Sequence, residues 1–115
     1  MVTEHGDVVW VDFGHLRGSE PVKIRPTVVL QDNWRLATEV NTVLVAPVTS
    51  NVSQETFPGN VLVPAGVSGL EMDSVALVTK LGPVSREFVE PHALGHLSAC
   101  VLGKIGAGLR LVTGV

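Results

Sequence analysis

The chain has 115 residues, 45% of them hydrophobic, which is enough for one compact core, so we expect a single domain over residues 1–115. A formal net charge of −3 argues against broad, nonspecific binding to nucleic acid, because such binding depends on neutralising phosphates. No apolar run approaches the roughly 18 residues of a membrane helix, and the N-terminus lacks the features of a signal peptide. We therefore expect a cytoplasmic protein that does not associate with membranes. Its single cysteine, Cys100, fits a reducing compartment and is predicted to be a small buried residue.

The first half of the chain predicts two strands separated by a loop. Residues 6–13, GDVVWVDF, alternate with a period of two, which is typical of a strand. Residues 14–23 contain two glycines, a serine and a proline and are predicted to be a loop that carries binding groups. Strand-forming residues resume at 26–31. Because Pro26 biases the preceding residue toward extended backbone, we expect Arg25 to be held rigidly where this strand begins.

Three further strands are predicted after a connection at residues 32–41, which contains at most one helical turn. Residues 42–48, TVLVAPV, are almost continuously apolar and indicate a buried strand, in which Pro47 ends the pairing or marks an edge. A short fourth strand is predicted within residues 60–66 and a fifth at residues 74–84. Short strands without intervening helices indicate an antiparallel sheet or barrel.

A helix is predicted at the C-terminal end. Val101, Ile105 and Leu109 recur every four residues, Ser98 is a suitable N-cap, and Gly114 lies just past the end. The helix also contains three glycines that permit close approach to the sheet or to a partner chain: Gly103, Gly106 and Gly108. The sequence thus predicts a mainly β domain with one C-terminal helix.

Two features suggest a site for a phosphate group. Arg25, with Lys23 beside it, offers a planar guanidinium fork that matches phosphate oxygens. Thr49 and Ser50 follow a buried strand and provide hydroxyl donors. The alternative interpretation is that Arg25 is a surface cation paired with Glu20 and that Thr49 begins a turn, and for either feature alone this alternative is favoured.

The sequence gives less support to a metal site or to catalysis by a pair of histidines. His92, His96 and Cys100 recur at intervals of four residues, a spacing that suits a metal on one helical face. Pro91 and Gly95 disfavour a continuous helix there, so no metal site is predicted. A histidine pair could perform acid–base work on RNA, but the sequence does not bring any two histidines together.

The ordered set of motifs resembles a known family. Taken in order, GDVVWVDFG, GSEPVKIRPTVVL, TVLVAPVTS and GLEMDSVALVTKLGPV are similar to the successive motifs of the MazF/PemK toxin endoribonucleases, over nearly the whole chain. The resemblance implies a small SH3-like β-barrel with a terminal helix (CcdB/PemK/MazF-like), assembled as a homodimer. It also implies sequence-specific, ribosome-independent cleavage of single-stranded RNA without a metal or other cofactor. The RNA 2′-hydroxyl would be the nucleophile, leaving a 2′,3′-cyclic phosphate and a 5′-hydroxyl and so inhibiting translation and growth.

The resemblance also assigns residues. Arg25 and Thr49 match the family's catalytic arginine and threonine, and because a guanidinium is almost never deprotonated in proteins, we predict that Arg25 stabilises charge. The remaining matches are implied substrate-binding residues: Gly18, Ser19, Glu20, Lys23, Ser50, Ser74 and Lys80. Several family members carry glutamine in place of Lys80 and arginine in place of Gly82, so the recognised RNA sequence does not transfer.

Three functions follow, in order of support. The first is the toxin of a type II toxin–antitoxin system, whose partner is a small antitoxin, MazE-like or of another class, with an acidic or amphipathic tail over the RNA groove. The second is a gyrase poison like CcdB, which shares the fold, but such toxins depend on an aromatic residue near the C-terminus and the final LVTGV has none. The third is a catalytically inactive SH3-like binding protein, for which a chain without tyrosine offers few aromatic residues.

Overall fold

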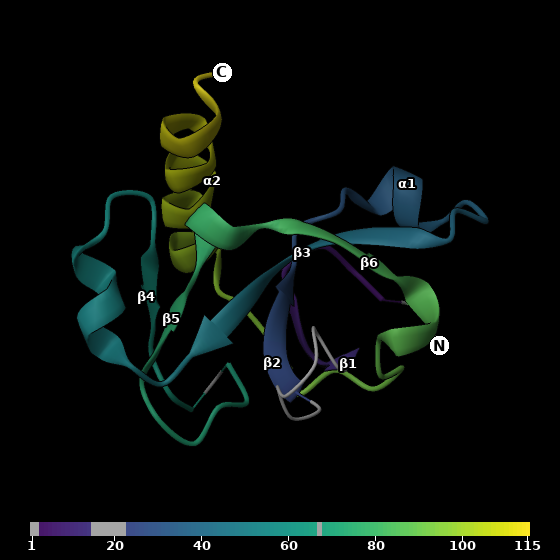
Figure 1. Ribbon diagram of the computed structural model, residues 1–115, viewed down its shortest axis with the longest axis horizontal. Coiled ribbons are helices and arrows are strands. Elements are labelled where there is room, and N and C mark those ends of the chain that lie inside the picture. Colours follow the sequence, from purple (N-terminus) through teal and green to yellow (C-terminus); the bar gives the residue numbers. More distant parts are fainter. Residues whose placement is uncertain (1–2, 15–22, 67) are drawn as a thin grey trace.

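The computed structural model describes residues 3–14, 23–66 and 68–115 and consists of a curled antiparallel sheet with one long helix against it (Figure 1). The strands are β1 (Asp7–Gly14), β2 (Lys23–Val29), β3 (Thr42–Thr49), β4 (Val61–Val63), β5 (Ser74–Ala76), β6 (Gly82–Ser85) and β7 (Gly95–His96). They follow the order β4-β5-β3-β2-β1-β7, and β6 pairs with β3. This arrangement confirms the predicted fold class, mainly β with a C-terminal helix.

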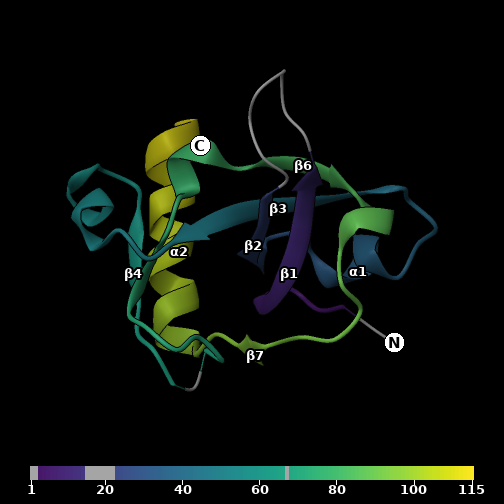
Figure 2. The same ribbon diagram turned by 60° about the horizontal axis from the view of Figure 1, so that its bottom comes forward.

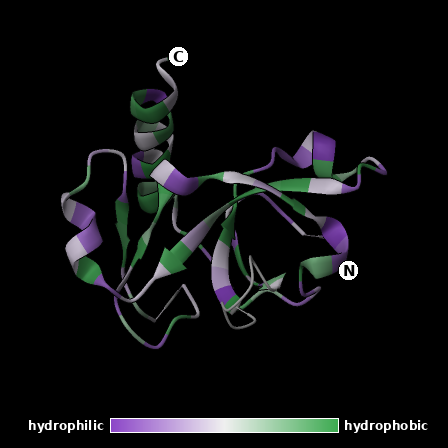
Figure 3. Cartoon of the chain, viewed as in Figure 1, coloured by the Kyte–Doolittle hydropathy of each residue, from purple (hydrophilic) through white to green (hydrophobic). Residues whose placement is uncertain are grey.

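The central strands β1, β2 and β3 bury apolar side chains on both faces, because successive residues of a strand point to opposite sides. One face packs under the helix α2 (Ala99–Thr113), where Val8, Val28, Ala46 and Val48 form a buried cluster with Ile105 of the helix. The other face contributes Val9, Val11, Val29, Val43 and Val45, which pack with Leu36. Figure 3 shows the resulting contrast between the largely hydrophobic β3 and the hydrophilic residues on the short helices at the two sides of the molecule.

Strand β2 begins earlier than the sequence predicts, at Lys23 instead of residue 26. Pro26 therefore lies inside the strand, where it pairs with Trp10 of β1. The pairing of β2 with β3 begins one residue later, at Thr27, so β2 has a neighbour on only one side at the proline. Proline is tolerated at such an edge position because a missing N–H costs no inter-strand bond there.

The prediction of one strand over residues 74–84 is wrong. The chain forms β5, then the 3₁₀ helix η2 (Val78–Lys80), then β6. The interruption is stabilised by a residue 19 positions earlier: the side-chain oxygen of Asn60 accepts hydrogen bonds from the backbone N–H and the hydroxyl of Thr79, at 3.2 and 3.0 Å. These bonds hold the backbone in a turn where the apolar pattern alone suggests a continuous strand.

Short elements fill the connections. The one-turn helix α1 (Asn33–Leu36) begins at Asp32, whose side chain accepts from the Asn33 N–H, in agreement with the single turn expected there. Two 3₁₀ helices, η1 (Val52–Thr56) and η3 (Arg86–Phe88), were not predicted. The two-residue strand β7 was also not predicted, because two residues carry no periodic pattern.

The C-terminal helix α2 is confirmed with its caps. The Ser98 hydroxyl accepts from the Val101 N–H at 3.2 Å, and Gly114 ends the helix with a φ of 75°, a left-handed conformation that glycine adopts without strain. The prediction that Cys100 is buried is wrong, since it is exposed next to the inward-facing Val101. No helix in the described part of the chain is long and apolar enough to span a membrane.

Two glycines, Gly108 in α2 and Gly59 in the turn before β4, allow the helix to approach the backbone of that turn closely. Gly108 is buried, and a Cβ added to it would collide with the backbone carbonyl of Gly59, in the turn before β4. Figure 2 shows α2 alongside β4, and the two elements are in contact. The close approach predicted from the helix glycines is thus confirmed at Gly108.

The contact between Gly108 and Gly59 predicts that two glycine-to-alanine substitutions in α2 change the free energy of unfolding in opposite directions. Gly108→Ala should destabilise the protein by about 1–3 kcal/mol, because overpacking a tight contact forces backbone shifts. Gly103→Ala should stabilise it by about 0.5–1 kcal/mol, because Gly103 is exposed with nothing near its added Cβ and alanine favours the helix. Urea unfolding of both variants measures the difference, and equal stabilities would show that the close contact is unimportant.

Candidate active site

Arg25 lies in β2, opposite Val11 of β1, and its side chain is half-exposed. Its backbone is fixed by the sheet and by the Thr27 hydroxyl, which donates to the Arg25 carbonyl at 3.1 Å. The backbone of Arg25 is therefore held firmly, as the sequence predicts. The residues on both sides of Pro26 are paired in the sheet, so strand pairing contributes to this rigidity as well as the proline ring.

Thr49 is the last residue of β3 and is half-exposed, and the exposed Ser50 follows it. The Thr49 Oγ1 accepts a hydrogen bond from the Asn51 N–H at 3.2 Å. A hydroxyl that accepts in this way still has its own hydrogen to donate. Thr49 thus presents a hydroxyl donor at the end of a strand, which is the position that the sequence predicts. Its contact with a phosphate oxygen stays a prediction.

The sheet places Arg25 and Thr49 on the same face. Strands β2 and β3 are antiparallel neighbours, and their pairing ends with Thr27 opposite Pro47. Arg25 and Thr49 each lie two residues beyond that pair, which is about 7 Å along each strand, and side chains two residues apart share a face. The prediction that Thr49 lies on a strand next to Arg25 is confirmed.

Beyond the Thr27–Pro47 pair the two strands diverge. The end of β3 leaves β2 and pairs with β5 instead, with Val48 opposite Ala76 and Thr49 opposite Val75. Figure 1 shows the tip of β3 running away from β2 below the point where they cross. The cation and the hydroxyl therefore stand on two strand ends that separate beyond the Thr27–Pro47 pair.

The predicted substrate-binding residues of the fifth strand lie elsewhere. Ser74 is 5% exposed, and its hydroxyl donates to the Met72 carbonyl at 2.9 Å. It pairs with Val63 of β4 and shares the face of Ala76, opposite to that of Thr49. The structure therefore does not bring Ser74 to the Thr49 hydroxyl. Lys80 is exposed at the end of η2, so its predicted alternation within a strand does not apply.

The remaining predicted residues are not all described. Gly18, Ser19 and Glu20 lie outside the described residues, and so does any pairing of Glu20 with Arg25. Lys23 begins β2 and pairs with Gly14 through its backbone, but its side chain also lies outside the described part. These residues stay predictions.

A polar framework that sequence reasoning missed lies next to Thr49. The Asn51 side chain accepts from the N–H and the hydroxyl of Ser53, at 3.2 and 2.6 Å, and caps η1. Asn60 links η1 to η2, because its amide donates to the Gln54 carbonyl at 3.1 Å while its oxygen accepts from Thr79. The sequence shows only that both asparagines lie in polar segments. Asparagine is common in turns of any kind, so this pattern does not predict the framework.

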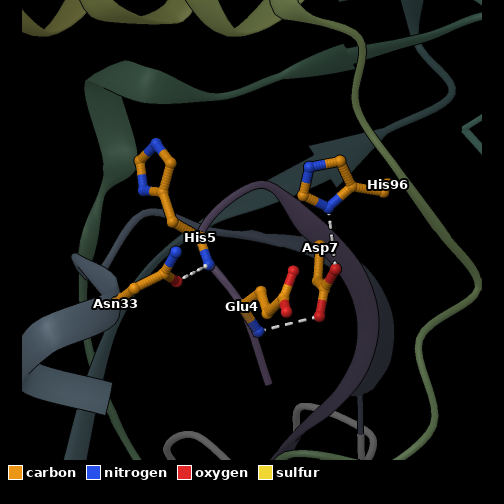
Figure 4. A network of polar contacts seen from close by, with 5 residues as sticks. All are labelled: Glu4, His5, Asp7, Asn33 and His96. Carbon is orange, nitrogen blue, oxygen red and sulfur yellow. Dashed lines mark hydrogen bonds and ion pairs between the residues drawn. The ribbon is translucent and has the colours of Figure 1, made fainter. Parts of the chain in front are cut away.

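A second group of ionisable residues lies at the start of β1. The His96 Nδ1 is 2.9 Å from the Asp7 Oδ1, and the other Asp7 oxygen accepts from the Glu4 N–H at 2.9 Å. Figure 4 shows the Glu4 and Asp7 carboxylates side by side near the His96 ring, and one ligand atom of each residue lies within 4.8 Å of the others. Only these three described residues could share a metal ion, and the group ties the N-terminal segment to β7. It lies at the start of β1, before Val11, the mid-strand residue paired with Arg25.

Comparison with known proteins gives consistent results. Residues 4–113 match the family model described as PemK-like, MazF-like toxin of type II toxin-antitoxin system. Endoribonuclease MazF6 of Mycobacterium tuberculosis H37Rv is 34% identical over 112 residues, covering 97% of each chain.

Solved structures are similar in fold. The MazE–MazF structure (Form-II) from Deinococcus radiodurans has a TM-score of 0.81 and 26% identity, covering 100% of this chain and 98% of the other. An endoribonuclease in complex with its cognate antitoxin, from a mycobacterial species, has a TM-score of 0.74 at 16% identity, covering 99% and 95% of the two chains. The likeness to the second of these concerns the fold alone.

Proposed function

Because this chain belongs to the family of PemK-like, MazF-like toxins of type II toxin–antitoxin systems, we propose that it is an endoribonuclease that cleaves single-stranded RNA at specific sequences. It needs neither the ribosome nor a metal ion for this reaction. The observation that carries the proposal is the placement of Arg25 and Thr49 on one sheet face, on two strand ends that diverge. A cation and a hydroxyl donor on one sheet face are suited to a phosphodiester.

The proposed reaction is attack of the RNA 2′-hydroxyl on the adjacent phosphorus. The 2′-oxygen loses its proton and forms a bond to phosphorus, and the bond from phosphorus to the 5′-oxygen breaks as that oxygen gains a proton. The products are a 2′,3′-cyclic phosphate and a 5′-hydroxyl. Negative charge builds up on the non-bridging oxygens, where the Arg25 guanidinium and the Thr49 hydroxyl stabilise it. The substrate supplies the nucleophile, so the protein contributes positioning and charge.

The proposed partners follow from the family. We expect a homodimer that binds a small antitoxin, and inhibition when the antitoxin covers the Arg25 and Thr49 face. The similar MazF protein from Deinococcus radiodurans was solved with MazE, which supports the antitoxin part of this expectation. The bound antitoxin would leave growth unaffected, and its loss would release RNA cleavage and arrest translation.

The proposal is tested by incubating the purified protein with a long RNA of mixed sequence in the presence of EDTA. Cleavage should occur at a restricted set of sequences and leave 5′-hydroxyl ends, which a kinase can label directly, and 2′,3′-cyclic phosphates. The same RNA annealed to its complement is the matched control and should be cleaved much more slowly. Loss of cleavage in EDTA, or 5′-phosphate ends, would contradict the mechanism.

A further inference from the structure

We infer that Asn51 is a positioning residue for Thr49, an assignment that rests on the proposed ribonuclease function. The two residues are joined directly, because the Asn51 N–H donates to the Thr49 Oγ1 at 3.2 Å. This bond occupies one lone pair of the hydroxyl oxygen. The hydroxyl hydrogen cannot point at the Asn51 N–H and stays available to donate to another acceptor, which we infer to be a phosphate oxygen.

The position of the Asn51 N–H depends on the Asn51 side chain. Its Oδ1 accepts from the Ser53 N–H at 3.2 Å and from the Ser53 hydroxyl at 2.6 Å, which makes Asn51 the N-cap of η1. The cap fixes the backbone of Asn51 at φ −77° and ψ 91°. Removing the side chain frees this backbone, and the N–H then no longer has a fixed direction toward Thr49.

The middle of η1 is anchored as well. The Asn60 side chain donates to the Gln54 carbonyl at 3.1 Å and accepts from the Thr79 N–H at 3.2 Å. The turn that holds Asn51 is therefore attached to η2, the element that ends at Lys80. A turn held at its N-cap and at its middle provides a fixed reference for the Thr49 hydroxyl, whereas a loose turn would not.

Asn51 matters for the proposed reaction because it controls the orientation of the Thr49 hydroxyl. Catalysis that depends on positioning is sensitive to small displacements, and a shift of about 1 Å can cost up to 10²-fold in rate. Asn51 is exposed, and its bonds are local to the turn, so its side chain has little to do with the core. Its loss should therefore act on kcat, through Thr49, much more than on the stability of the fold.

The test compares Asn51→Ala with Asn51→Ser, because serine retains a capping oxygen without adding a charge near the phosphate. Asn51→Ala should lower kcat about tenfold with KM nearly unchanged, and Asn51→Ser should recover most of the loss. Ser53→Ala, which removes only the 2.6 Å bond to Asn51, should give a smaller loss. Asp32→Ala is the matched control, since it removes the cap of α1 and should leave cleavage unchanged.

A double-mutant cycle separates positioning from general damage. In a Thr49→Ala background Asn51→Ala should cause no further loss, because the residue acts through the missing hydroxyl. A full additional loss, wild-type cleavage by Asn51→Ala, or an equal loss in Asp32→Ala would each overturn the inference while leaving the proposed function intact. Wild-type cleavage by Thr49→Ala alone would instead overturn the catalytic role of Thr49 and this inference with it.

Discussion

Replacing Arg25 with alanine is expected to lower the rate of RNA cleavage about 10³-fold without unfolding the protein. The guanidinium supplies the positive charge at the proposed phosphate site, and removing such a group from phosphoryl-transfer sites typically costs 10²–10³-fold or more. The backbone contacts of Arg25, its pairing with Val11 and the bond from the Thr27 hydroxyl, do not require its side chain. Cleavage of a defined RNA by the purified variant, with a melting curve beside it, measures both effects.

Two further substitutions make this result interpretable. Arg25→Lys keeps the charge but lacks the planar fork, so it should recover part of the activity, leaving a loss of about 10–10²-fold. Arg35→Ala removes an exposed arginine at the end of α1 and should leave cleavage unchanged. If Arg25→Ala cleaved at the wild-type rate, or if Arg35→Ala were equally impaired, the electrostatic role of Arg25 would be wrong.

The fold was predictable where the sequence pattern is long and local. Alternation over residues 6–13 and the apolar run at residues 42–48 predict β1 and β3 because each strand buries several of its apolar side chains. The helix α2 has a four-residue repeat with both caps in place. The single strand over residues 74–84 was wrong because its pattern continues through Thr79, and the bonds that turn the chain there come from Asn60, 19 residues earlier.

The candidate site was predictable in part for a similar reason. Arg25 and Thr49 stand next to strong strand signals, so a pairing of adjacent strands was enough to bring them to one face. Ser74 was assigned to the site by resemblance, but the strand pairing turns its hydroxyl to the other face. The contact between Asp7 and His96 spans 89 residues and leaves no spacing in the sequence that could reveal it.

The role of Thr49 gives the second prediction of large effect. Thr49→Ala should lower the cleavage rate about 10²-fold, because it removes one donor to the developing charge on the phosphate oxygens. Thr49→Ser keeps the hydroxyl and the bond from the Asn51 N–H, and it should remain within a few fold of the wild-type rate. Thr38→Ala, at an exposed threonine beyond α1, is the matched control and should have no effect. Single-turnover cleavage of a defined RNA measures all three.

The combination with Arg25 tests whether the two residues serve one phosphate group. If both stabilise the same transition state, the double variant Arg25→Ala/Thr49→Ala should lose less than the product of the single losses, since residues that act as a unit are not additive. Full multiplicativity would indicate that they act at separate places. If Thr49→Ser were as impaired as Thr49→Ala, the methyl group would matter more than the hydroxyl, and the phosphate contact assigned to Thr49 would be wrong. The two side chains stand on strand ends that diverge beyond Thr27 and Pro47, so a sub-multiplicative loss is the result expected if one bound phosphate group couples them.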